Sequence, residues 1–152
     1  MTSQAASIQS NIEATPPIRN KVNRLSGRIR IFQSTVTVSA TPPAIGETIT
    51  WGSLPKNANV LGYLSQLRFS AGAAAQTLNL GDSASAARHL VATSVTAAGS
   101  AVPEAAAANG ATFETSDDST AATNNCRLIS TVAGATLTPG QVLTLRMAYT
   151  LD

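Results

Sequence analysis

The chain has 152 residues, which is long enough for one domain with a substantial core, and only 12% of them are charged. Soluble domains usually carry roughly 25% charged residues, so this composition disfavours a solitary, highly soluble monomer and favours burial of surface in an assembly. The single cysteine, Cys126, excludes an intrachain disulfide.

Basic charge gathers at the N-terminal end. Residues 1–30 hold five basic residues and one acidic residue, a net charge of +4, whereas residues 31–152 carry a net charge of −2. A short basic segment on a slightly acidic body suits an acidic protein groove, nucleic acid or an acidic membrane. Phe32 is the only aromatic residue close to these charges, so a stacking platform for nucleic acid bases is missing.

Residues 1–27 are expected to form an extended arm. Their aliphatic residues are spaced too thinly for a helix face or a strand face, and Pro16-Pro17 hold the backbone extended. A tail without a role is the alternative, but the spaced aliphatic residues could dock into small pockets on a neighbour. The residues expected to contact a partner are Ile8, Ile12, Ile18, Arg19, Val22 and Arg24.

The N-terminus lacks a basic stretch followed by a continuous apolar run, and no run approaches the ~20 apolar residues that cross a bilayer. We therefore expect the protein to be made and used without membrane insertion, in a cytoplasm.

Two strand-like segments open the body of the chain. Arg28–Ile31 has its isoleucines on odd positions, whereas Thr35–Ala40 has its apolar residues on even positions. Successive side chains of a strand point to opposite faces, so one straight strand cannot turn both sets to the core. The sequence therefore predicts a bulge or bend around Phe32-Gln33-Ser34.

Between residues 46 and 82, short β-prone runs are separated by the turn formers Gly, Pro and Asn. The only tryptophan, Trp51, lies near the end of one run, and Leu54-Pro55-Lys56-Asn57 then predicts a corner. The expected strands are Glu47–Trp51, Val60–Ser70 and Gln76–Leu80.

The second half of the chain continues the same pattern. Residues 99–110 predict a loop with at most one helical turn, because the alanine run is too short for a stable helix. Thr138-Pro139-Gly140 predicts a type II turn before the clearest strand, in which Leu143 and Leu145 face one way and Thr144 and Arg146 the other. The other expected strands are Ala87–Thr93, Ala111–Thr115 and Cys126–Val132.

Eight or nine short strands without a convincing helix predict an all-β fold, an antiparallel β-sandwich. Several connections are too long for tight hairpins, so a jelly-roll-like sandwich is favoured over a meander. The expected organisation is an extended N-terminal arm over residues 1–27 and one β-sandwich domain over residues 28–152.

The sequence does not supply the parts of an active site. Gly81-Asp82-Ser83 resembles the nucleophile block of esterases, but the only histidine, His89, follows the serine by six residues, and no Asp-x-x-His block lies near the C-terminus. We therefore interpret the block as a hairpin turn. His89 is expected to be hydrogen-bonded on a strand, and Cys126 to be a small buried apolar residue.

Metal chemistry is also disfavoured. Asp117-Asp118 and Glu114 offer too few oxygens for Ca²⁺, which takes 6–8 ligands, and one histidine with one cysteine cannot form a zinc cluster. We expect no catalytic residues, no cofactor and no metal.

A family resemblance enters at Gly46-x-x-Ile49-x-x-Gly52-x-Leu54-Pro55-Lys56-x-Ala58-x-Val60-Leu61-Gly62. It continues at Leu78-x-Leu80-Gly81-Asp82, Arg88-His89-Leu90, Thr131-Val132-Ala133-Gly134-Ala135 and Leu143-x-Leu145-x-x-x-Tyr149. Over roughly residues 28–152 the sequence resembles capsid decoration, or cement, proteins from the heads of tailed bacteriophages. The basic arm and the Ala-rich and Asp-rich insertions between Gly99 and Asn125 depart from that pattern.

The resemblance implies a non-enzymatic structural protein of the virion that binds and stabilises the major capsid shell through non-covalent contacts. The implied partners are the major capsid protein and further copies of this chain, as a homodimer or homotrimer, with no nucleic acid and no membrane. The implied location is the outer capsid surface, after synthesis in the host cytoplasm. The alternative is an adhesive or carbohydrate-binding module of a tail or head fibre. That function needs exposed aromatic residues, and the chain has only six aromatic residues in all.

Overall fold

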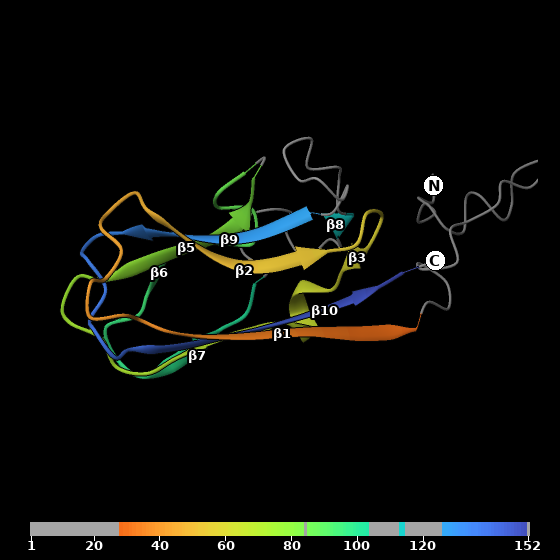
Figure 1. Ribbon diagram of the computed structural model, residues 1–152. Coiled ribbons are helices and arrows are strands. Elements are labelled where there is room, and N and C mark those ends of the chain that lie inside the picture. The colour runs from red at the N-terminus through yellow and green to blue at the C-terminus, as the bar shows by residue number, and fades with distance from the viewer. Residues whose placement is uncertain (1–27, 84, 104–112, 115–125, 152) are drawn as a thin grey trace, which may run out of the picture.

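The structure is a computed structural model that describes residues 28–83, 85–103, 113–114 and 126–151. Two antiparallel sheets form the layers of a sandwich, with β2 and β9 in one layer and β1, β7 and β10 in the other (Figure 1). The first sheet contains β1 (Ile29–Thr37), β3 (Asn59–Val60), β4 (Gln66–Phe69), β7 (Gly99–Ala101), β8 (Phe113–Glu114) and β10 (Val142–Thr150). The second sheet contains β2 (Thr48–Leu54), β5 (Thr77–Asp82), β6 (Leu90–Ser94) and β9 (Cys126–Ala133). The prediction of an all-β antiparallel sandwich is confirmed.

The strand pairing is nested from the ends of the described chain inward. β1 pairs with β10, β2 with β9, β4 with β7 and β5 with β6, always antiparallel. Two further pairings, β10 with β4 and β9 with β5, give the sheet orders β1-β10-β4-β7 and β2-β9-β5-β6. Four nested pairs rolled into two four-stranded sheets are the jelly roll, to which β3 and β8 add a short extension beside β10.

The core lies between the sheets and is filled by the alternate residues of each strand. On β10, Leu143 and Leu145, which the sequence placed on one face, are fully buried together with Met147. β9 alternates between buried and half-buried side chains along its whole length. Trp51 on β2 donates its indole N–H to the Ser130 hydroxyl on β9 at 2.8 Å, so its polar atom is satisfied inside the core.

The predicted bulge in the first strand is wrong. β1 pairs with β10 in one unbroken register, from Ile29 opposite Thr150 to Thr37 opposite Val142. The even positions of β1 turn toward the core, and Ile29 and Ile31 remain on the outer face with 54% and 67% of their surface exposed. The apolar residues change from odd to even positions because this straight strand carries apolar residues on both of its faces.

The second sheet has its own irregularity. The register between β2 and β9 shifts between Thr50 and Gly52. Gly52 has a φ of 144°, and a Cβ there would lie 2.9 Å from the ring of Phe32 on the opposite sheet. A glycine is required because the ring of Phe32 occupies that space.

The predicted strand Val60–Ser70 is interrupted. β3 ends at Val60, the 3₁₀ helix η1 (Gly62–Leu64) follows, and β4 begins at Gln66. The Ser65 hydroxyl accepts the backbone N–H of Ala148 on β10 at 2.9 Å, in place of a backbone carbonyl. This side-chain hydrogen bond replaces one backbone hydrogen bond to β10. The segment between β3 and β4 therefore leaves the sheet, and Tyr63 and Leu64 are exposed.

Two other boundaries differ from the prediction. β6 begins at Leu90, three residues later than expected, because the preceding residues form a turn. Gly99–Ala101 is strand β7 where a loop was predicted, and its pairing with β4 sets Gly99 opposite Phe69. Residues 104–112 lie outside the described part of the chain.

The predicted type II turn is confirmed. Gln141 donates its backbone N–H to the Thr138 carbonyl at 3.1 Å, and Gly140 has the positive φ, 80°, that this turn needs at its third residue. Among the described residues, no helix is long and apolar enough to span a membrane.

Candidate functional site

The block Gly81-Asp82-Ser83 forms the turn that leads from β5 toward β6. Asp82 is 2% exposed, accepts the Ser85 backbone N–H at 2.8 Å and forms an ion pair with Arg88 at 2.5 Å. A Cβ on Gly81 would lie 2.0 Å from the Ser85 carbonyl oxygen, so only glycine lets the turn close. The carboxylate and the glycine of this block therefore stabilise a turn, as predicted from the sequence.

His89 lies at the end of this turn, just before β6, and not on a strand as predicted. It is 3% exposed, and its backbone N–H donates to the Leu80 carbonyl at 2.8 Å. Burial lowers the pKa of His89 to about 4; the charge of Asp82 opposes this shift and the charge of Arg88 adds to it. The imidazole is therefore neutral at pH 7. Ser83 is exposed.

Cys126 is 3% exposed at the start of β9 and lies 3.9 Å from an Asp82 carboxylate oxygen, so it is the small buried residue that was expected. Within the described ranges, no three His, Cys, Asp or Glu residues are placed to hold a metal ion. Asp117, Asp118 and the side chain of Glu114, which the sequence analysis considered for Ca²⁺, lie outside the described part of the chain.

The residues expected to contact a partner also lie outside the described part of the chain. They are Ile8, Ile12, Ile18, Arg19, Val22 and Arg24. The described part of the chain begins at Arg28, which β1 follows.

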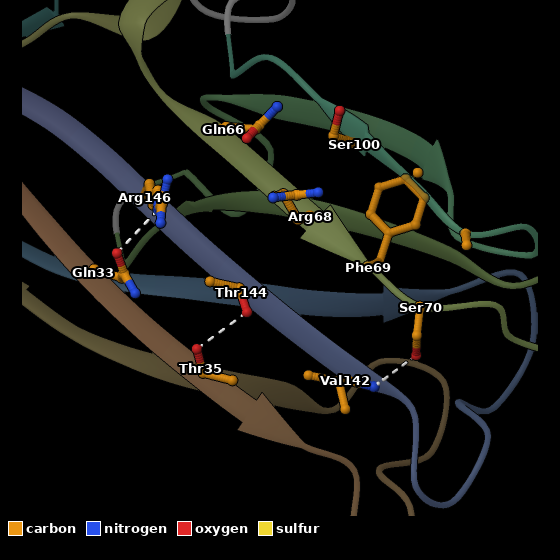
Figure 2. A pocket seen from close by; sticks show the side chains of 12 residues that line it. Gln33, Thr35, Gln66, Arg68, Phe69, Ser70, Ser100, Val142, Thr144 and Arg146 are labelled. Carbon is orange, nitrogen blue, oxygen red and sulfur yellow. Dashed lines mark hydrogen bonds between the residues drawn. The ribbon is translucent and has the colours of Figure 1, made fainter.

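The described surface offers one feature that sequence reasoning missed, a depression of about 690 Å³ on the outer face of the β1-β10-β4-β7 sheet. We call it the polar groove (Figure 2). Four strands contribute to it, because the outward residues of each strand meet those of its neighbours across the pairing register. Its lining residues are Gln33, Thr35, Gln66, Arg68, Phe69, Ser70, Ala98, Gly99, Ser100, Val142, Thr144 and Arg146.

Hydrogen bonds across β1 and β10 hold the floor of the polar groove. Arg146 donates its Nε–H to the Gln33 amide oxygen at 2.9 Å, and the hydroxyls of Thr35 and Thr144 lie 3.1 Å apart (Figure 2). These bonds fix rotamers that an exposed side chain would otherwise sample, so the groove presents ordered polar groups.

The polar groove is positively charged. Arg68 on β4 and Arg146 on β10 are both exposed, and none of the lining residues is acidic. Among the described residues, no carboxylate lies within ion-pair distance of either guanidinium. The alternation along the last strand had already placed Arg146 on the outward face, but only the strand pairing shows that Arg68 shares that face beside it.

The described residues thus form an antiparallel jelly roll with a polar groove on the outer face of one sheet. The chain is similar to a chain of a solved structure described as "Cyanophage Pam1 capsid asymmetric unit", with a TM-score of 0.63 and 24% sequence identity. The alignment covers 83% of this chain and 86% of that one. No protein-family model and no curated protein sequence matches the chain. The chain therefore shares its fold with a chain from a cyanophage capsid.

Proposed function

We propose that the protein is a structural component of a phage virion, a decoration or cement protein that binds the outer surface of the major capsid shell. The observation that carries this proposal is the jelly roll shared, over 83% of the chain, with a chain of a phage capsid. Jelly rolls occur in lectins as well as in capsids, so the surface must also fit the role.

Three features of the surface fit a protein that works inside an assembly. Charged residues make up only 12% of the chain, which reduces repulsion between closely packed neighbours. Ile29 and Ile31 are exposed on the outer face of β1, next to the arm. β1 also pairs only with β10 among the described strands, and an edge strand can pair with a strand of a neighbour.

The surface gives less support to the alternative function, a carbohydrate-binding module. Sugar binding commonly uses exposed aromatic rings, and Tyr63 is the only exposed aromatic residue among the described side chains. Trp51, the largest aromatic side chain, is buried in the core.

In this proposal, the arm over residues 1–27 adds to the contact with the shell. Isolated aliphatic residues fill small pockets, and the basic residues meet acidic surface on the shell. Many copies on one lattice multiply a modest contact per copy, so a homodimer or homotrimer would hold more strongly than a monomer.

A binding assay with shells tests the function. Full-length protein is mixed with phage shells that lack it, the shells are sedimented, and bound copies are counted on gels. We expect saturable binding and a higher disruption temperature for decorated shells. A variant without residues 1–27 should keep the far-UV circular dichroism of a β protein and lose most of its binding. Full occupancy by the truncated protein would overturn the role of the arm, and no binding by the full-length protein would overturn the function.

A further inference from the structure

Two arginines and no acidic residue line the polar groove. Arg68 and Arg146 belong to adjacent strands, where Arg68 is opposite Thr144 and Arg146 is opposite Gln66. Residues in this diagonal relation lie about 7–8 Å apart, so the two positive side chains face the same space. Like charges this close destabilise the isolated protein slightly, and a bound anionic group would reverse that effect.

The guanidinium of Arg146 is held by a hydrogen bond within the polar groove. Its Nε–H is taken up by Gln33, which fixes the plane of the group and leaves the two terminal nitrogens for another acceptor. Arg68 extends between Thr144 and Ser100, its register partners on either side (Figure 2). A guanidinium held in this way binds a carboxylate with two parallel hydrogen bonds and at low entropic cost.

The shape of the groove favours an extended chain. Its floor follows β10 from Val142 to Arg146, about 14 Å at roughly 3.4 Å per residue. This length matches about four residues of extended polypeptide. The rest of the lining is rich in hydroxyl and amide groups, which can pair with the N–H and C=O groups of such a chain.

We propose that the polar groove docks an extended, carboxylate-bearing segment of the shell protein, with Arg68 and Arg146 each binding an acidic side chain. The inference rests on the proposed function and adds to it the face that meets the shell and the charge of its partner. The arm of this chain does not fit the same place, because residues 1–30 carry a net charge of +4 and would be repelled by the two arginines.

Nucleic acid fits the groove less well than an acidic peptide. The half-buried Phe69 is the only aromatic residue in the lining, and its ring packs against the core. Two arginines also supply few phosphate contacts, whereas proteins that bind nucleic acid through its backbone commonly use six or more.

Charge reversal at single positions tests the proposal. Full-length R68E and R146E are compared with R127E, which makes the same change of charge on β9 of the other sheet, away from the groove. Binding to shells that lack the protein is measured by sedimentation. We expect R68E and R146E each to weaken binding at least tenfold, while R127E stays within twofold of the native protein. Near-native thermal unfolding of each variant shows that the loss is not misfolding.

A charge-retaining variant and a salt series separate electrostatic docking from packing. R68K/R146K keeps both positive charges and should recover part of the binding that R68E/R146E loses. Native binding should weaken as NaCl is raised, and the R68E/R146E variant should depend on salt much less.

The outcomes separate the two proposals. If native protein binds shells and R68E/R146E binds equally well, the groove inference is overturned and the proposed function stands. If native protein does not bind shells, both are overturned. Tight binding to a fluorescein-labelled oligothymidine that R68E/R146E abolishes would overturn docking of an acidic peptide in favour of nucleic acid.

Discussion

Acidification should destabilise the jelly roll through His89, the only histidine of the chain. The imidazole is 3% exposed, and burial lowers its pKa from 6.5 to about 4. Between these two pKa values His89 is protonated in the unfolded chain but neutral in the folded chain. The free energy of unfolding therefore falls as the pH falls. The contribution of the neutral His89 to the free energy of unfolding is fully present above pH 6.5. It is lost as the pH drops toward 4, and below pH 4 this group causes no further loss.

The size of the effect follows from the shift. One proton changes the free energy of unfolding by about 1.4 kcal/mol per pH unit within the window, or by about 2 kcal/mol between pH 7 and pH 5. The side chain is almost fully buried, so little of the effect is lost to solvent screening.

Urea unfolding, followed by tryptophan fluorescence at a series of pH values, measures this slope. Trp51 is buried, so its emission should shift on unfolding. The matched variant is His89→Gln, which removes the titrating group. We expect the variant to be less stable at pH 7 and to show a flat stability profile from pH 7 to 5.5. A native protein whose stability is constant over that range, or a variant that keeps the native slope, would refute the reasoning.

Three further substitutions test the packing of the sandwich by thermal or chemical unfolding. Leu145→Ala on β10 should cost about 2–5 kcal/mol, because Leu145 is fully buried and its truncation leaves a cavity in the core; a cost below ~1 kcal/mol would contradict the core assignment. Gly134→Ala should cost much more than Gly46→Ala, since both glycines have positive φ but only at Gly134 would a Cβ collide, 2.1 Å from the Ala75 carbonyl oxygen; equal costs would count against this geometry. Gln76→Leu should cost about 1–3 kcal/mol, because the fully buried amide joins two loops through three hydrogen bonds, and a neutral result would mean that these bonds do not stabilise the fold.

Local patterns in the sequence predicted the parts of the fold that depend on local chemistry. The alternation from Leu143 onward gave β10 its inward face, and the Pro139-Gly140 pair gave the type II turn. The buried Cys126 and the structural role of Gly81-Asp82 also followed from residue type. Each of these depends on residues that are close together in the chain.

The features that were not predicted from the sequence depend on contacts between segments that are distant in the chain. The isoleucines at 29 and 31 looked like core residues, because apolar character does not tell which face of a straight strand is covered. The break in Val60–Ser70 needs the Ser65 hydroxyl to meet β10, which is 83 residues away from it in the chain. The polar groove combines Gln33, Arg68 and Arg146, which only the pairing of β1, β10 and β4 brings together.

Cryo-electron microscopy of the virions that carry this protein tests the central claim most directly. The claim is that the jelly roll is an outer component of the shell. We predict density for the sandwich on the outer capsid surface, with the polar groove facing an acidic segment of the shell protein. Finding the protein in the tail, or finding none of it in the particle, would contradict the account.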